Sequence, residues 1–171
     1  MTIQHQARPT DRAVAGEIRT HHAAMVTTLD ELTTSLQRAA ADKAADTAAD
    51  ARTALTSWFH DVLVPHADEE EATTYRAAAR LPEGRLLIRS MVQEHVLVKR
   101  LVSHFEEADD ARVAAAYGRA VFDVFESHQA KENEIILPLL LDAASLSLGE
   151  VVSAGHGHQL HHDHDHDPQR P

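Results

Sequence analysis

The chain has 171 residues, a formal net charge of −11, six glycines, six prolines, no cysteine and only 4% aromatic residues. This length suffices for one domain with a real core, and the many alanines and few aromatics favour an all-α fold over a β-sheet fold. The acidic balance argues against a nucleic-acid-binding surface, and the lack of an 18-residue apolar run argues against a transmembrane helix.

The first predicted helix covers residues 11–39. Apolar residues recur along it in steps of three and four, which is the spacing of one buried helical face. His22 falls on this apolar face and His21 on its flank. The next stretch, 40–50, is small and polar, and it fits either a loop or a continued polar helix.

The second predicted helix covers residues 51–78, and its apolar face includes His66 and Glu70. Pro65 lies inside this helix, directly before the histidine. Proline removes a backbone donor and crowds the preceding turn. Because the apolar period continues through Pro65, we expect a kink there rather than the end of the helix.

The third predicted helix covers residues 82–108, with Pro82 at a favoured first-turn position and His95 in the apolar face. The fourth covers residues 111–141 and follows an Asp109–Asp110 pair that can cap it.

The apolar face of the fourth helix contains His128 and Glu132. Pro138 is expected to bend or end this helix. Ser147 and Glu150 form a capping-box pattern for a short fifth helix, residues 148–154.

Two terminal segments differ in composition from the rest of the chain. Residues 1–10 read as an N-terminal extension, and residues 155–171 as a disordered, low-complexity tail rich in histidine and aspartate. The tail contains His156, His158, His161, His162, His164 and His166. These imidazoles are mostly uncharged at neutral pH and can bind metal ions.

Four long helices with short connections predict an antiparallel up-down-up-down four-helix bundle over residues 11–154, with a short C-terminal helix. In such a bundle the four histidines, one in each long helix, fall at nearly the same level. An imidazole in an apolar seam is costly unless it has a polar partner, so four at one depth indicate a shared partner.

A metal centre is the natural shared partner. A histidine and a glutamate four residues apart lie on one helical face about 6 Å from each other, so they can bind one ion together, or the glutamate can bridge two. Imidazole and carboxylate ligands suit iron, and manganese or zinc less well in this setting. Glu69 is an alternative to Glu70, since a three-residue spacing also works.

The order His, His-x-x-x-Glu, His, His-x-x-x-Glu resembles the hemerythrin-like (HHE cation-binding) domain. The matching motifs are THH at 20–22, PHADEE at 65–70, QEH at 93–95 and HQAKE at 128–132. The resemblance covers about residues 11–141 and implies a four-helix bundle with two non-haem iron ions, oxo- or hydroxo-bridged. The ligands that it implies are His22, His66, Glu70, His95, His128 and Glu132.

One position departs from the oxygen-carrying hemerythrins. These have a second histidine four residues after the first on the third helix, where this chain has Lys99. The missing ligand is expected to leave one iron more open, which disfavours clean reversible oxygenation and favours reaction with peroxide or nitric oxide. Lys99 itself is a candidate to assist proton movement.

The predicted function is therefore binding or turnover of a small oxidant, namely peroxide, dioxygen or nitric oxide, at a buried di-iron site. As an enzyme the protein would be a catalase-like or nitric-oxide-handling oxidoreductase with a role in stress response. The alternative is a non-catalytic sensor, store or delivery protein for iron or oxygen. A chain without cysteine and with no apolar leader at its N-terminus fits a cytoplasmic protein.

Overall fold

The computed structural model describes residues 8–159, and within them every regular element is helical. The elements are α1 (Pro9–Ala41), α2 (Ala45–Trp58), η1 (Phe59–Leu63), α3 (Val64–Ala72), α4 (Thr74–Ala78), α5 (Gly84–Glu107), α6 (Ala111–Lys131), η2 (Glu132–Ile136), α7 (Leu137–Asp142) and α8 (Leu148–Gln159). None of these helices is long and apolar enough to cross a membrane.

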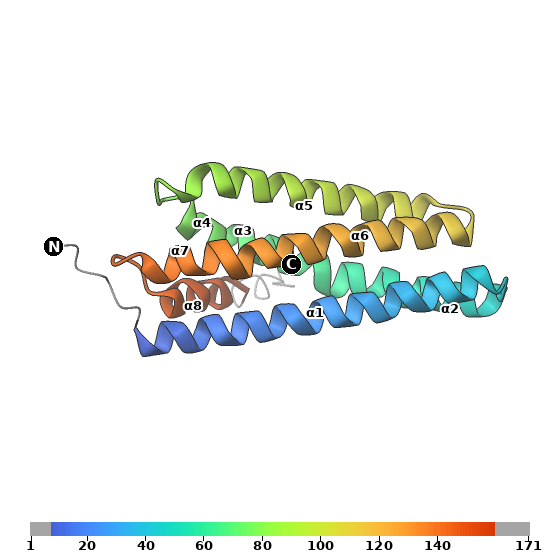
Figure 1. Cartoon of the computed structure of the whole chain (residues 1–171), viewed down its shortest axis with the longest axis horizontal. Helices are drawn as coiled ribbons and strands as arrows, with labels where there is room; N and C mark the ends of the chain where they lie inside the picture. Colours follow the sequence, from blue (N-terminus) through green and yellow to red (C-terminus); the bar gives the residue numbers. More distant parts are fainter. Residues whose placement is uncertain (1–7, 160–171) are drawn as a thin grey trace, which may run out of the picture.

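The elements form four long rods that run alternately up and down, as Figure 1 shows. The rods are α1; α2 to α4; α5; and α6 to α7. This confirms the predicted all-α bundle with a short C-terminal helix. The stretch at 40–50 is almost entirely helical, because only Asp42–Ala44 form a turn, with Lys43 in the left-handed region at a φ of 56°.

The second rod continues through Pro65, as the expected kink requires. It does so by widening into a π-helical turn, η1, where the Val64 N–H donates to the Phe59 carbonyl one residue further back than in an α-helix. Pro65 has no N–H to donate to the Asp61 carbonyl. The wider turn therefore lies where the series of α-helical hydrogen bonds is interrupted in any case. The helix then resumes with His66 in its first turns.

The fourth rod repeats this arrangement. It widens into a second π-helical turn, η2, where the Leu137 N–H donates to the Glu132 carbonyl, and Pro138 follows in the next turn. The rod goes on to Asp142, so the proline bends it rather than ends it. Each π turn lies directly beside a candidate ligand pair, and π turns are frequent at functional sites.

The corner between the second and third rods differs from the prediction. The third rod begins at Gly84 rather than at Pro82, which lies in the turn. Gly84 packs directly on the backbone of Ala78, where a Cβ would come within 2.0 Å of the Ala78 carbonyl oxygen. The turn of 79–83 is therefore needed to bring the two helices into this contact before α5 begins.

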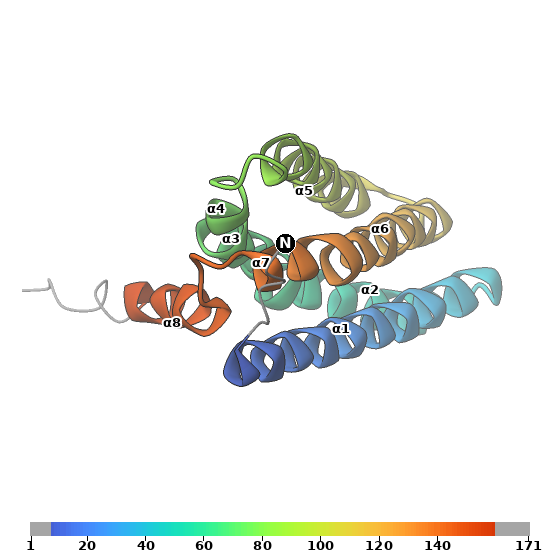
Figure 2. The ribbon, with the colours of Figure 1, turned by 60° about the vertical axis from the view of Figure 1, so that its left-hand side comes forward.

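The last helix, α8, packs outside the four rods against α1 and α4, as Figure 2 shows. Its N-terminus is held by Asp11 of α1, which accepts hydrogen bonds from the Gly149 N–H and the Ser147 hydroxyl, both at 3.0 Å. The expected capping contact of Ser147 with the Glu150 N–H is longer, at 3.5 Å. The helix extends past residue 154 to Gln159, and the predicted disordered tail from 160 onward lies outside the described residues.

The bundle interior consists of two apolar clusters with a polar layer between them. The larger cluster lies toward the α1–α2 and α5–α6 turns and includes Leu29, Phe59 and Phe105. The smaller cluster lies toward α4, α7 and α8 and includes Met91 and Ile136. The four predicted histidines come from the level between these clusters, so their surroundings exclude most solvent.

Candidate metal centre

The polar layer brings all six candidate ligands together. Their donor atoms form two groups, and within each group all donor atoms lie within 4.8 Å of one another. We call the group of His22, His66, Glu70 and Glu132 position A, and the group of Glu70, His95, His128 and Glu132 position B. The two glutamates belong to both groups, so the two positions share a pair of carboxylates.

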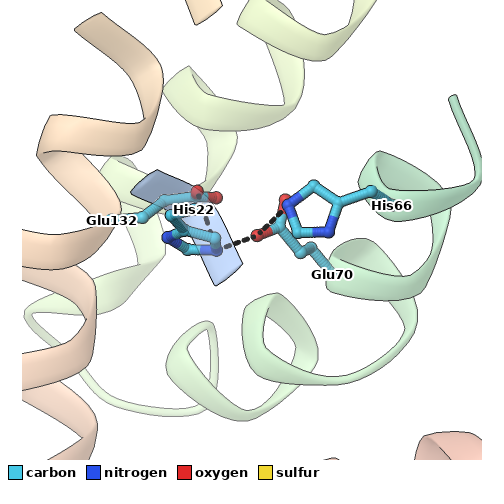
Figure 3. A group of neighbouring side chains, drawn as sticks. All are labelled: His22, His66, Glu70 and Glu132. Carbon is cyan, nitrogen blue, oxygen red and sulfur yellow. Dashed lines mark ion pairs between the residues drawn. The ribbon is translucent and has the colours of Figure 1, made fainter. Parts of the chain in front are cut away.

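Position A is built from three rods, as Figure 3 shows. His22 comes from α1, His66 and Glu70 from α3, and Glu132 from η2. Nε2 of His66 lies 3.1 Å and Nε2 of His22 lies 3.5 Å from Oε1 of Glu70. Nε2 of His22 is also 4.0 Å from Oε2 of Glu132. All three distances join an imidazole nitrogen to a carboxylate oxygen, as in a set of donors that converges on one cation.

Position B brings its two imidazoles face to face. Nε2 of His128 lies 3.3 Å from Oε1 of Glu132, and Nε2 of His95 lies 3.6 Å from Oε2 of Glu70. The Nε2 atoms of His95 and His128 face each other at 2.9 Å. Two imidazole lone pairs at this distance repel unless a proton or a cation lies between them, so the geometry calls for positive charge here.

Carboxylates outside the centre orient the two imidazoles of position B. The Nδ1–H of His95 donates to Glu71 at 2.8 Å, and the Nδ1–H of His128 donates to Glu94 at 2.9 Å. Lys131 also donates to Glu94. Such partners fix the tautomer and leave Nε2 as the inward-facing lone pair, as is typical of histidines that bind metal.

Position A has a weaker outer partner. The Nδ1–H of His22 donates to the amide oxygen of Asn133 at 2.9 Å, so a neutral group takes the place of the carboxylates at position B. Burial alone would lower the pKa of His66, but the hydrogen bond and the charge of Glu70 outweigh it and raise that pKa. At position B the pKa of His128 is raised in the same way, because Glu132 outweighs the effect of burial.

Glu70 is the most strongly perturbed carboxylate of the centre. Burial alone would raise its pKa, but the neighbouring imidazoles of His22, His66 and His95 outweigh burial and hold that pKa well below the usual range. Glu70 is therefore an anion that attracts positive charge. Metal ions and protons compete for such ligands.

The buried carboxylate oxygens test whether a cation fits the centre. Oε2 of Glu70 and Oε2 of Glu132 are buried and have no hydrogen-bond donor among the described residues. Leaving a buried acceptor without a donor costs about 1–3 kcal/mol, and more for a charged group. Both oxygens belong to the donor groups of positions A and B, and coordination to a cation is the interaction that would satisfy them.

Tyr75 belongs to position B and was missed at the sequence level. Its hydroxyl donates to Oε1 of Glu132 and lies 2.9 Å from Nε2 of His128. Its ring stacks on His95 with centroids 5.2 Å apart and planes 7° apart. Burial, followed by the negative charge of Glu132, raises the pKa of Tyr75, so its proton stays in place in the absence of a metal.

The break between α3 and α4 explains why the helical spacing did not reveal Tyr75. It follows Glu70 by five residues, which a continuous helix would place on a different face. Thr73 leaves the helical region, at φ −119° and ψ −91°, and the chain turns so that Tyr75 points into the centre. The sequence carries no clear signal for this break.

Lys99 does not take part in the centre, contrary to the suggestion that it assists proton movement. Its Nζ lies 2.6 Å from Oδ1 of Asp68 at the surface between α5 and α3. The structure also distinguishes Glu69 from Glu70, because only Glu70 belongs to the two donor groups. Glu69 lines a cavity beside position A instead.

This cavity has a volume of about 430 Å³ and leads to position A. His22, His66 and the two shared glutamates form its inner end, while Glu17 and His21 of α1 lie on its wall. The His21 ring is 5.4 Å from the His66 ring, so the expected flank position of His21 is beside the centre rather than far from it. Tyr75 and the two shared glutamates also line the cavity, but His95 and His128 do not, so the two imidazoles of position B are shielded on this side.

Comparison with protein families agrees with this arrangement. The family described as the hemerythrin HHE cation-binding domain matches residues 13–140, which include all six candidate ligands. Comparisons with curated proteins and with solved structures found no match. A family match over most of the chain and a buried cluster of histidines and glutamates together indicate a metal-binding protein. The chain belongs to the hemerythrin HHE cation-binding domain family.

Proposed function

We propose that the protein binds two non-haem iron ions and turns over a small oxidant, namely peroxide, dioxygen or nitric oxide. The observation that carries this proposal is the sharing of Glu70 and Glu132 by positions A and B. Two adjacent groups of donors with two carboxylates in common form a site for a pair of ions bridged by those carboxylates. Mixed imidazole and carboxylate ligation favours iron, as in other di-iron carboxylate bundles.

The protein residues would hold the ions in unequal ways. At position B, His95 and His128 would act as terminal ligands, and the Tyr75 hydroxyl, which contacts Glu132 and His128, would offer a further oxygen. At position A, His22 and His66 act as terminal ligands, and the side toward the cavity stays open. The pair of ions would supply two electrons to an oxidant, one from each ion.

Position A is where the oxidant would bind. The cavity is lined by the imidazoles of His22 and His66 and not by those of His95 and His128, so a small molecule can approach position A without displacing packed side chains. The apolar clusters on both sides of the centre limit the access of bulk water, which strengthens electrostatic interactions at the site. Open access at one ion and tight packing around the other fit a site for reaction rather than storage alone.

Elemental analysis and peroxide decay test this proposal together. The full chain with the six tail histidines replaced by glutamine is expected to retain about two irons and to consume hydrogen peroxide. His66→Ala should keep the helical content and lose most of the peroxide consumption. A protein that keeps no iron, or one in which His66→Ala is as active as the parent, would contradict the proposal.

A second candidate function is an iron or oxygen sensor, or a protein that stores or delivers iron. The observation that favours it is the histidine-rich sequence after residue 155, which follows the bundle in the sequence and offers further metal donors. Tight iron or dioxygen binding without peroxide consumption would support this candidate over the oxidoreductase. Either function fits a cytoplasmic protein whose ligand is a small molecule.

A further inference from the structure

The cavity beside position A is much larger than a diatomic oxidant or hydrogen peroxide requires. Its volume is about 430 Å³. Cavities of about 300 Å³ or more are of the size that organic ligands occupy in proteins. The cavity therefore has room for a substrate with an organic part.

The residues that line the cavity are of two kinds. His22, His66, Glu70 and Glu132 offer the imidazoles and carboxylates of position A, whereas Ile18, Ile136, Leu137 and Val152 supply apolar wall. A ligand that fits both kinds of lining has one polar group that faces position A and an apolar body. The carboxylates of Glu17 and Glu69 also line the cavity and disfavour a ligand with a negative charge of its own.

The cavity depends on the helix that lies outside the four rods. Val152 of α8 forms part of its wall, and α8 is held against α1 by the Asp11 contacts with Gly149 and Ser147. Figure 2 shows α8 beside the bundle rather than as one of its rods. This helix thus adds apolar wall to a site that the four rods alone would leave more open to water.

We infer that the cavity binds an uncharged organic hydroperoxide, with the hydroperoxide group at position A and the organic part against the apolar wall. This inference rests on the proposed function, and it names the substrate class. Reduction of ROOH breaks the O–O bond and consumes two electrons and two protons, giving ROH and water. A pair of iron(II) ions held by the six ligands would supply the two electrons of a single turnover, and solvent would supply the two protons.

Binding of an unreactive product analogue tests the inference without turnover. The probe is 2-phenyl-2-propanol, the alcohol formed from cumene hydroperoxide, titrated by calorimetry into the full chain loaded with redox-inert zinc. Measurable binding is expected for the parent protein. Val152→Trp fills the cavity and should weaken binding about tenfold or more, whereas Val113→Trp, an exposed position on α6, should leave it unchanged.

A comparison of cumene hydroperoxide with hydrogen peroxide separates the organic binding site from the proposed oxidant function. With the iron(II)-loaded protein, Val152→Trp should slow single turnover of cumene hydroperoxide about tenfold or more, and it should slow that of the much smaller hydrogen peroxide by a smaller factor. Ile18→Trp fills the cavity from α1 and should have the same effect. Agreement between the two variants would show that filling of the cavity, and not displacement of α8, slows the reaction. Loss of both reactions, with alcohol binding intact, contradicts the oxidant function but supports the organic binding site.

Two results would overturn the inference. One is that the alcohol does not bind to the zinc-loaded parent protein. The other is that both cavity-filling variants bind the alcohol as tightly as the parent and the Val113→Trp control do. In either case the reaction with hydrogen peroxide can persist, so failure of this inference is distinguishable from failure of the proposed function.

Discussion

Positions A and B share two carboxylates but differ in almost everything around them. Position B has two buried imidazoles, each held by an outer carboxylate, and a buried tyrosine hydroxyl beside them. Position A has one imidazole held by a neutral amide, and it faces a cavity. The same donor types thus build two different positions. In the proposed function, the closed position would hold its ion firmly and the open position would let a ligand exchange.

The largest expected effect comes from removing what the two positions share. Glu132→Ala removes a carboxylate from both donor groups, so the metal content should fall from about two ions per chain to well below one. Glu126→Ala, at an exposed position on α6, is the matched control and should keep both ions. Elemental analysis of both variants, in the background without tail histidines, measures this difference. Two retained ions in Glu132→Ala would show that the carboxylate is not shared.

Removing one terminal ligand should separate the positions. His66→Ala takes a donor from position A only, so about one ion should remain, because position B keeps all of its own donors. His95→Ala takes a donor from position B only and should cost more affinity, since it also removes the ring on which Tyr75 stacks. Calorimetric titration with zinc distinguishes the two variants. Equal losses would contradict the claimed difference between A and B.

The outer partners should matter more at position B than at position A. Glu94→Gln removes the carboxylate that holds His128, and outer partners of metal-binding histidines are typically worth about 10–100-fold in metal affinity. Asn133→Ala removes only a neutral partner of His22 and should cost less. Competition with a chelator gives both affinities. A larger effect of Asn133→Ala would reverse the assignment of the firmly held position.

Tyr75→Phe should have a moderate effect on the metal-free protein. The substitution removes a buried hydrogen bond to Glu132, and hydrogen bonds to charged groups contribute about 1.5–3 kcal/mol. The free energy of unfolding should fall by about that amount in urea denaturation of the metal-free chain. Tyr117→Phe, farther along the bundle in α6, serves as the control. An unchanged midpoint for Tyr75→Phe would argue against the contact.

The smallest expected effect concerns the attachment of α8, which forms part of the cavity beside position A. The Gly149 N–H, together with the Ser147 hydroxyl, holds the pKa of Asp11 below its ordinary value of 3.8. A lowered pKa in the folded protein means that Asp11 stabilises the fold above about pH 3.8, and that this contribution is lost as the pH falls through the lower, folded-state pKa.

Amide exchange at Gly149 measures this attachment. Protection of its N–H should be clear at neutral pH and should weaken as Asp11 becomes protonated. Asp11→Asn should weaken it at all pH values, because an amide oxygen is a poorer acceptor than a carboxylate. Asp30→Asn, at a partly exposed position on the same helix, is the control. Protection at Gly149 that does not depend on Asp11 would contradict the capping contact.

Much of the fold could be predicted from the sequence because helical spacing is a strong local signal. The apolar faces that contain His22 and His128 have the period of a helix, so these residues were expected to point inward, and both are buried. The continuation of the second rod through Pro65 could also be predicted, since the period is unbroken there. The convergence of six donors followed from the equal depth of the histidines in an antiparallel bundle.

The features that the sequence did not reveal depend on departures from regular helices. Tyr75 reaches the centre only because the chain breaks at Thr73, and no residue type marks that break. The surface pairing of Lys99 with Asp68 depends on how α5 packs against α3. The cavity depends on where α8 docks, which is set by the Asp11 contacts more than 130 residues away in the chain. Such contacts carry no periodic signal.

Anomalous diffraction from crystals of the iron-loaded protein tests the central claim most directly. Two peaks are expected inside the bundle, one between His22 and His66 and the other between His95 and His128. Their separation should be about 3.5–4 Å, as in other sites where two metal ions act together, with Glu70 and Glu132 between them. A single peak, or peaks only outside the polar layer, would contradict the account.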